Sequence, residues 1–479
     1  FQGVDVLGRP FGWVKGPGDW TAVSAAIARG QPVAVIQDSG STLWQAHLPH
    51  PHPFQWDGEA VGTARPQARL WISASQRPLT PDPAFPQVQW HPRVLWVGVG
   101  CERGTPRGVI EAGIEQVFKA HDLALGAIAG LASLDLKANE GGLVELCQER
   151  GWPLRCYHAD DLKVVPVPNP SAVVAQAVQT PSVAEAAAIL AAGGELRVAK
   201  QVLRLAGQPG AVTVAIAEAE QEYIGRPGQL ALVGIGPGSL AQITPAAKQA
   251  ITQADAVIGY SLYIDQIRPL CRPGQILEPW AITQERERAE RAIALAQWGL
   301  TVAVVSSGDC GIYGMAGLVL EQLQATGWDG TTPAVQVYPG ISALQAAAAR
   351  VGAPLMHDFC AISLSDLLTP WEVILQRLTA AAQADFVIAL YNPKSKTRTH
   401  QIETAHQIVM TYRPPETPVA IVKSAYRPEE MLYTTTLKDL LTVPIDMLTV
   451  ILIGNQSTRQ HQGWLITPRG YSGKKIASL

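Results

Sequence analysis

The sequence has few cysteines, and none of them are closely paired. Its 479 residues include six cysteines, without a C-x-x-C motif among them. Structural zinc sites usually need closely spaced cysteine pairs, and disulfide frameworks are typical of small secreted chains. We therefore predict free thiols, no structural metal site and a reducing, cytoplasmic location. The cysteines are Cys101, Cys147, Cys156, Cys271, Cys310 and Cys360.

A strong charge of one sign and long apolar runs are also lacking. The formal net charge is -3, and no long basic run occurs. Proteins that capture nucleic acid or anionic membranes electrostatically carry basic patches. No apolar run reaches the roughly 18 residues that a membrane-spanning helix needs, and no signal peptide is recognisable. We expect neither a nucleic-acid partner nor a membrane partner.

The sequence is instead rich in apolar residues. Hydrophobic residues make up 47% and charged residues 16% of the chain, which favours well-buried α/β layers over disorder. At this length two or more domains are expected. The chain begins at Phe1 in what resembles the interior of a domain, so we expect a further segment upstream.

The stretch Leu230–Ser239 predicts a ligand-binding loop. Four apolar residues indicate a buried parallel strand, and three glycines follow it. Thr244 and Pro245 then suit the start of a helix. A strand, a bare loop and a helix form a ligand crevice at the carboxyl end of a parallel sheet. The G-x-G-x-G spacing and Pro237 argue against a dinucleotide fingerprint, and a simple tight turn stays an alternative. The three glycines are Gly234, Gly236 and Gly238.

Two α/β modules are predicted before this stretch. Residues 1–92 are rich in Trp, Pro and Gln, and their His50 and His52 are either exposed loop histidines or, less favoured, metal ligands. Residues 93–220 alternate strand-like and helix-like segments, with one strand predicted at 124–129. In this second module Ser182 and Glu185 have the spacing of a capping box.

Six features of the second module resemble the C-terminal domain of cobalt-precorrin-5A hydrolase. They are residues 99–105, 135–140, 168–171, 181–188 and 212–217, together with Lys200. Residues 1–92 are similar to the middle domain of that family. The family's N-terminal domain has no counterpart here, and Glu102 replaces its usual arginine.

The resemblance implies a lactone hydrolase, and a non-catalytic substrate-binding or docking module is the alternative. Polar residues near the predicted strand ends and helix starts would contact the substrate. They are Arg103, Lys137, Glu140, Ser182, Glu185 and Lys200. Glu185 would otherwise serve only as the capping-box partner.

The remaining chain resembles tetrapyrrole methyltransferases, and within them the precorrin-3B C-17 methyltransferase family. Five ordered motifs carry this resemblance: residues 234–238, 307–315, 338–343, 391–395 and 453–457. It implies a two-lobed class III methyltransferase fold, with an N-terminal lobe at 229–346, a C-terminal lobe at 347–460 and a tail at 461–479. Cys310 stands where the family usually has proline or alanine, which we interpret as a small packing change.

The same resemblance implies S-adenosyl-L-methionine as the cofactor and S-adenosyl-L-homocysteine as its product. The cofactor would fold into a cleft between the two lobes, where glycine backbone can approach it closely. The expected cofactor contacts are Gly234, Gly236, Pro237, Gly238, Asp309, Ile312, Tyr313, Ser342, Ala343, Tyr391 and Asn392. Ser342 could instead act only as a helix cap, and Asp309 only as a turn residue.

The implied reaction is methylation at C-17 of precorrin-3B, or of its cobalt counterpart, with contraction of the macrocycle. Methylation of another tetrapyrrole carbon is an alternative. Ring contraction needs a base, for which the candidates are Asp309, His357, Asp358, Lys423 and Glu430. Cationic candidates for the substrate's carboxylate arms are Lys394, Lys396, Arg398 and Arg427. The resemblance also implies a homodimer and neighbouring enzymes of the cobalamin pathway as partners.

Overall fold

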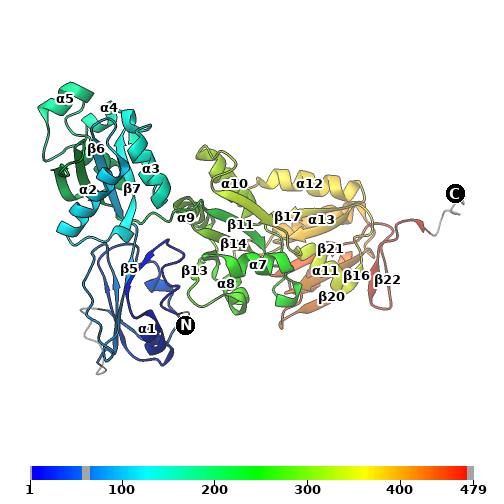
Figure 1. Cartoon of the computed structure of the whole chain (residues 1–479). Helices are drawn as coiled ribbons and strands as arrows, with labels where there is room; N and C mark the ends of the chain where they lie inside the picture. The colour runs from blue at the N-terminus through cyan, green and yellow to red at the C-terminus, as the bar shows by residue number, and fades with distance from the viewer. Residues whose placement is uncertain (1–2, 57–64, 472–479) are drawn as a thin grey trace, which may run out of the picture. The chain divides into compact units, whose positions relative to one another are not determined.

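The chain forms two compact units. The computed structural model describes residues 3–56 and 65–471. The first unit contains the described residues up to Gly228, with Arg272–Ile276 and Gln297–Leu300, and the second contains the rest (Figure 1). The predicted free thiols are confirmed, because all six cysteines are unpaired. No helix within the described ranges is both long and apolar enough to cross a membrane.

The first unit begins with a five-stranded sheet in the order β1-β5-β4-β2-β3. Its strands are β1 (Val14–Gly18), β5 (Gln87–His91), β4 (Ala68–Ile72), β2 (Val33–Gln37) and β3 (Phe54–Trp56). Only the β1–β5 pair is antiparallel. Helix α1 (Trp20–Ala28) begins where Asp19 accepts a hydrogen bond from Ala22 N–H. The large side chain of Trp90 is fully buried in this module.

A second five-stranded sheet of the first unit has helices on both faces. Its order is β8-β7-β6-β10-β9, with β8 (Leu154–Tyr157), β7 (Ile128–Leu134), β6 (Leu95–Cys101), β10 (Val212–Glu218) and β9 (Leu196–Leu203). Alternate residues of β6 face opposite ways. Val97 lies in one apolar cluster with α2 (Arg107–Ala120) and α3 (Gly141–Arg150). Trp96 lies in another cluster with α6 (Ala184–Ala192).

One predicted strand of this module is wrong. The apolar run at 124–129 predicts a strand, but it contains a short 3-10 helix, Leu125–Ala127. The strand β7 begins only at Ile128. The reason is local, because Ala127 N–H bonds to the Ala124 carbonyl and closes a turn.

The second unit begins with a parallel sheet in the order β13-β12-β14-β11-β15. The strands are β13 (Ile276–Trp280), β12 (Ala256–Tyr260), β14 (Thr301–Ser306), β11 (Gln229–Gly234) and β15 (Ala334–Tyr338). Gly234 is opposite Ser306, and Val233 is opposite Tyr338. The carboxyl ends of β11, β14 and β15 therefore meet at one edge. The predicted helix start is confirmed, because Thr244 caps α7 (Pro245–Gln253) and Pro245 is its first residue.

The second half of this unit is a mixed sheet in the order β17-β18-β21-β19-β20. Its strands are β17 (Phe359–Ser363), β18 (Val387–Tyr391), β21 (Thr449–Ile453), β19 (Pro418–Lys423) and β20 (Met431–Thr436). Helices α12 (Trp371–Gln383) and α13 (Gln401–Tyr412) share one apolar cluster with this sheet. Helix α11 (Ala343–Val351) shares another, so both faces are covered (Figure 1).

A small three-stranded sheet includes part of the predicted tail. Its order is β16 (Gly352–Ala353), β23 (Trp464–Ile466) and β22 (Arg459–His461). Residues 464–466 are thus tied to the second half of the unit by the parallel β16–β23 pair. The last part of the predicted tail, residues 472–479, lies outside the described residues.

Candidate functional site

Four glycines from three loops meet at the carboxyl edge of the parallel sheet. Gly236 N–H donates to the Gly308 carbonyl at 3.0 Å, and Gly308 N–H donates back to Gly236 at 2.7 Å. A Cβ on Gly234 would lie 2.7 Å from Gly308 O and 2.8 Å from Gly340 N. Only backbone fits where these loops cross, because the neighbouring loops fill the space beside Gly234.

Asp309 joins two of these loops. Its Oδ1 accepts from Gly340 N–H at 2.9 Å, and its Oδ2 accepts from Gly311 N–H at 2.9 Å. The bond to Gly311 is the turn contact that the sequence offered as the alternative role. The bond to Gly340 crosses from the β14 loop to the β15 loop. Asp309 therefore fixes the edge of the site through both oxygens.

The start of α11 is held by a tyrosine from the sheet on which this helix packs. Ser342 caps α11 in a capping box with Gln345. Its Oγ lies 2.5 Å from the hydroxyl of Tyr391, which also accepts from Leu344 N–H at 2.9 Å. Within the described residues, the amide of Ala343 at the helix start has no assigned acceptor. Because helix N-termini attract anions, this amide is the best placed of the group for a ligand.

Burial changes the pKa of a tyrosine beside this helix. The pKa of Tyr391 is raised by burial, so its hydroxyl stays neutral near neutral pH. Its ring lies 4.9 Å from that of Tyr313, whose hydroxyl donates to the Ala361 carbonyl. Tyr313 has a left-handed backbone, with a φ of 55°, and remains 55% exposed beside Ile312, which is 39% exposed. Exposed apolar side chains here suit a flat ligand.

Of the other predicted cofactor contacts, Pro237 and Gly238 meet an arginine from the second half. Pro237 offers its carbonyl to Arg427 Nε at 2.8 Å. A Cβ on Gly238 would lie 2.5 Å from the same Nε, and Gly238 has a φ of 122°, so glycine is required there. Asn392 follows β18 and donates from its side chain to Ser363 Oγ at 3.0 Å. These residues therefore lie on the two facing sets of loops.

Most of the candidate bases lie outside this group of loops. His357 is in the segment between β16 and β17, where its Nδ1 accepts from Asp358 N–H. Lys423, at the end of β19, pairs with Asp446 at 2.5 Å. Among the five candidates, Asp309 is the one that lies where the glycine loops cross.

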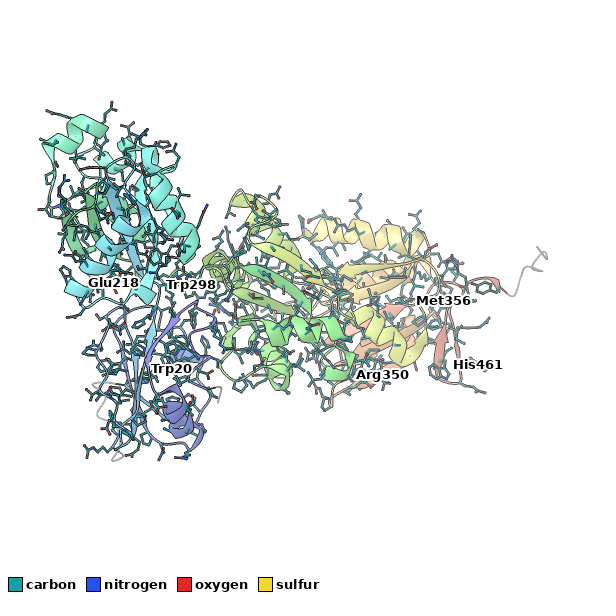
Figure 2. All side chains as sticks on the ribbon, in the orientation of Figure 1. Trp20, Glu218, Trp298, Arg350, Met356 and His461 are labelled. Atoms are coloured by element: carbon teal, nitrogen blue, oxygen red, sulfur yellow. The ribbon has the colours of Figure 1, made fainter. Side chains whose placement is uncertain are left out.

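Glu430 is held as an anion. Arg350, at the end of α11 and labelled in Figure 2, contacts both of its oxygens at 2.6–3.1 Å. These hydrogen bonds hold the pKa of Glu430 below its ordinary value. Tyr426 N–H also donates to it at 2.7 Å. A carboxylate stabilised in this way is a weak proton acceptor.

The cationic candidates differ in their surroundings. Lys394 is half-buried and Lys396 is exposed. Arg398 is half-buried and donates to the Asn392 carbonyl at 2.9 Å and to Ser365 Oγ at 3.3 Å. It therefore supports the loop after β18.

In the first unit, Arg103, Lys137 and Glu140 come together. Glu140 accepts from Gly104 N–H at 2.7 Å and from Lys137 Nζ at 3.3 Å. The Gly104 amide, and then Lys137, hold the pKa of Glu140 below its ordinary value, with a weaker contribution from Arg103. Glu102, at the departure from the hydrolase pattern, pairs with Arg204 at 3.0 Å.

Ser182, Glu185 and Lys200 lie near a second polar cluster, and the predicted capping box is wrong. Val183, not Ser182, is the N-cap of α6, and Ser182 Oγ is buried without a hydrogen-bond partner in the described part of the chain. Glu185 is fully buried and accepts from the backbone and side-chain amides of Asn169 and from Lys200 N–H. Lys200 Nζ donates to the Asn169 carbonyl. Glu185 holds the Asn169 loop instead of the helix start.

The histidines of the first module form an aromatic group. The rings of His50 and His52 are 5.3 Å apart, and His52 also lies 5.9 Å from the ring of Phe54. Burial lowers the pKa of His52. Over residues 3–56 and 65–471, no group of three or more His, Cys, Asp or Glu side chains is arranged to hold a metal ion.

One buried charge was missed by the sequence analysis. Arg288 belongs to α9 (Glu285–Trp298), whose sequence suggests a charged surface helix. It is only 4% exposed. The sequence contained one indication of this burial, because Ala292 and Leu295 follow Arg288 at helical spacing on the buried face.

Glycine loops at the end of a parallel sheet, faced by a second α/β half, form a two-lobed α/β domain, and its sequence matches a tetrapyrrole methylase family model. The protein-family model described as "Tetrapyrrole (Corrin/Porphyrin) Methylases" matches residues 229–441. "Cobalamin synthesis G C-terminus" matches residues 95–217, and "Cobalamin biosynthesis central region" matches residues 2–92.

Similar proteins narrow this class further. A probable cobalt-factor III C(17)-methyltransferase of Salmonella typhimurium is 46% identical over 243 residues, covering 51% of this chain and 99% of the relative. A precorrin-3B C(17)-methyltransferase of Sinorhizobium is 41% identical, covering 51% and 98%. A cobalt-factor III methyltransferase of Priestia megaterium is 52% identical, covering 52% of this chain but 46% of the relative. This chain thus spans less than half of that relative's length.

The crystal structure of the methyltransferase CobJ is 39% identical and covers 50% of this chain and 100% of its own, with a TM-score of 0.48. From the family model and the relatives, the chain belongs to the tetrapyrrole (corrin/porphyrin) methylase family. Its N-terminal region carries the two cobalamin-synthesis domains. The predicted resemblance to a fusion of hydrolase-like modules with a C-17 methyltransferase is confirmed.

Proposed function

We propose that the second unit transfers a methyl group from S-adenosyl-L-methionine to C-17 of a precorrin-3B-type macrocycle, with or without cobalt, and supports contraction of its ring. The observation that carries this proposal is the likeness to C(17)-methyltransferases along nearly their whole length. The glycine crossing supports it by packing three loops together at the carboxyl edge of the parallel sheet, where open α/β sheets bind ligands.

The proposed chemistry asks little of the protein beyond positioning. A sulfonium donor carries an activated leaving group, so holding the acceptor carbon in line with the methyl group supplies much of the catalysis. The loops around Gly234, Gly308 and Gly340 would form one wall of the S-adenosyl-L-methionine site, which we call the donor wall. The Ala343 amide would donate a hydrogen bond to a polar group of the donor. Tyr313 and Ile312 would pack against the bound ligands.

Asp309 is the proposed base for ring contraction. It lies where the loops cross, and each of its oxygens accepts one protein N–H, which leaves lone pairs for a substrate hydroxyl. The macrocycle's hydroxyl proton would pass to one of these oxygens. Lys394, Lys396 and Arg427 are proposed contacts for carboxylate arms, while His357, Lys423 and Glu430 have less support as bases.

For the first unit we propose a lactone hydrolase-like role on the same class of macrocycle. The polar clusters around Glu140 and Glu185 are the proposed substrate contacts. The second candidate is a non-catalytic binding or docking module. It is favoured by the pairing of Glu102 with Arg204, which keeps a carboxylate where the hydrolase pattern has an arginine. Acetaldehyde release from cobalt-precorrin-5A would separate the two, since a docking module releases none.

Methyl transfer is tested with the full chain and a donor carrying a carbon-13 methyl group. Incubation with precorrin-3B and, separately, with cobalt-factor III should place the label at C-17 of one or both macrocycles, as located by NMR. Label at another carbon would support the alternative regiochemistry. If neither macrocycle carries the label although the donor binds, the proposal is refuted. The homodimer stays a prediction that sedimentation analysis can check.

A further inference from the structure

Arg288 is a buried cation without adequate partners. Its side chain is 4% exposed, and Nε and Nη1 donate no hydrogen bond in the described part of the chain. Its Nη2 meets only the sulfur of Met315, at 3.7 Å. Glu285 and Glu287 act on it through space from the same helix. The guanidinium remains charged near neutral pH, and leaving its donors unpaired in a dry site is costly.

Another buried arginine of the same unit shows how the protein satisfies such a group. Arg413 is 3% exposed, and its Nη1 donates to the Gly454 carbonyl at 2.6 Å. Its Nη2 donates to the carbonyls of Ala381 and Phe386, while its Nε makes no hydrogen bond in the described residues and lies 3.9 Å from Asp385 Oδ1. Carbonyl oxygens thus accept hydrogen bonds from Arg413, and these bonds connect separate segments of the second half. Arg288 has no such set, so its role is different from that of a structural crosslink.

The position of Arg288 connects it to the site. Met315, which it contacts, ends the loop after β14, and the Met315 amide donates to Ser306 Oγ at 3.1 Å. Ser306 is the last residue of β14, so Arg288 lies near the carboxyl edge of the parallel sheet. Ligands of open α/β sheets bind at that edge.

A second arginine, Arg427, acts on the same part of the site. Tyr263, in the helix after β12, is under the electrostatic influence of both Arg427 and Arg288. Arg427 is itself bonded to the Pro237 carbonyl in the glycine loop. Two guanidinium groups, one from each half of the unit, therefore lie near Tyr263 beside the loop that forms the donor wall. Glu285, from the same helix as Arg288, also acts on this tyrosine.

We propose that Arg288 is a carboxylate anchor of the methyltransferase site, whose missing partner is supplied by a bound ligand. A guanidinium binds a carboxylate through two parallel N–H groups, which would satisfy the donors now left unpaired. The flexible side chain of Met315 would move aside as the carboxylate enters. This inference rests on the proposed function, since both ligands of that reaction carry carboxylates.

The carboxylate could come from either ligand. The donor has one, on its methionine part, and the macrocycle has several, on its acetate and propionate arms. Both present the same chemistry to a guanidinium. The sources differ in experiment, because the donor product can be titrated in the absence of any macrocycle.

The test compares Arg288→Met and Arg288→Lys with Arg286→Met in the full chain. Arg286 belongs to the same helix but is exposed and pairs only with Glu290, so its variant is the control. Calorimetry with S-adenosyl-L-homocysteine measures the donor site, and the KM for the macrocycle at saturating donor measures the other. We expect one of the two to weaken about 10- to 100-fold in Arg288→Met. Arg288→Lys should recover only part of the loss, and the control should be unchanged.

Thermal melting of the ligand-free protein separates binding from folding. Arg288→Met should melt at or above the wild-type temperature, because it removes an unpaired buried charge. If the donor is the source, the variant and wild type should bind decarboxylated S-adenosylmethionine equally well.

Each result bears on the inference. Unchanged affinity for both ligands in a folded Arg288→Met protein would overturn it while leaving the proposed function intact. A lower melting temperature with unchanged affinities would assign Arg288 a structural role and overturn it equally. A wild-type protein that binds neither ligand would refute the proposed function and this inference together.

Discussion

Two buried charged side chains, Glu185 in the first unit and Arg288 in the second, differ in how their hydrogen bonds are satisfied. In the first unit, Glu185 is fully buried and receives three N–H donors from Asn169 and Lys200. In the second unit, the strand ends carry glycines without side chains, and Arg288 has two unpaired donors among the described residues. A saturated group stabilises the fold, whereas an unsaturated one gains free energy when a ligand arrives. This difference is the basis for our proposal that Arg288 of the second unit meets a ligand.

The largest effect is expected when the fully hydrogen-bonded carboxylate of Glu185 is replaced. Glu185→Gln turns one acceptor oxygen into a donor that faces the amides of Asn169 and Lys200. We expect a loss of about 3–5 kcal/mol in the local stability of the first unit. Hydrogen exchange of residues 168–203 measures it, with exposed Glu220→Gln as the control. A loss below about 0.5 kcal/mol would show that the Asn169 loop does not depend on Glu185.

The next effect concerns the glycines that cross at the carboxyl edge of the parallel sheet in the second unit. Gly340→Ala would place a Cβ against the backbone of Gly308 and 2.8 Å from the Gly234 carbonyl carbon. We expect a stability loss of about 1–3 kcal/mol and at least about tenfold weaker S-adenosyl-L-homocysteine binding, because backbone cannot yield as a side chain can.

The matched control for this change is Gly317→Ala. Gly317 lies in helix α10 (Ala316–Ala325), and a Cβ added there would meet no heavy atom within 4 Å, so alanine should be tolerated or stabilising. Equal donor affinities for Gly340→Ala and Gly317→Ala, measured by calorimetry, would remove the steric argument for the donor wall.

A smaller effect depends on pH and sharpens the account of the first unit. The pKa of Glu140 is lowered in the folded protein, chiefly by the Gly104 amide. Its stabilising contribution is therefore complete above its ordinary pKa of 4.5 and is lost as pH falls through the folded value. Acid unfolding of wild type and Glu140→Gln should converge below that window and differ by on the order of 1 kcal/mol above it. A constant difference at all pH values would contradict this linkage.

The smallest effect is expected at Cys310. Its thiol is buried and bonds to the carbonyls of Leu232 and Tyr338 at 3.3 and 3.5 Å, and burial raises its pKa to about 11. Cys310→Ala should change stability by about 1 kcal/mol or less and leave methyl transfer unchanged. A large loss of turnover in a stable variant would show that the thiol contributes to the reaction.

The sequence predicted the parts of the fold that depend on local pattern. Apolar runs ending in glycine marked β11 and β14, and Thr244-Pro245 marked the start of α7. Ser342 was correctly placed as a possible helix cap, since its spacing to Gln345 gives a capping box. These features depend on neighbours within a few residues, which a single sequence displays.

The remaining features depend on contacts between distant residues. The Tyr391 hydroxyl caps a helix that begins 48 positions earlier at Ala343, which no local pattern indicates. Glu185 had the spacing of a capping box, yet the loop at Asn169 takes its oxygens. Arg288 lies in a highly charged stretch of sequence, and the structure shows that its side chain is buried.

The central claim is that the carboxyl edge of the parallel sheet in the second unit binds a sulfonium donor against bare backbone. Calorimetric titration of S-adenosyl-L-homocysteine into the full chain tests it most directly. The account predicts saturable binding at one site per chain, with a Kd between about 1 μM and 1 mM. Absence of saturable heat over that range, with properly folded protein, would contradict it.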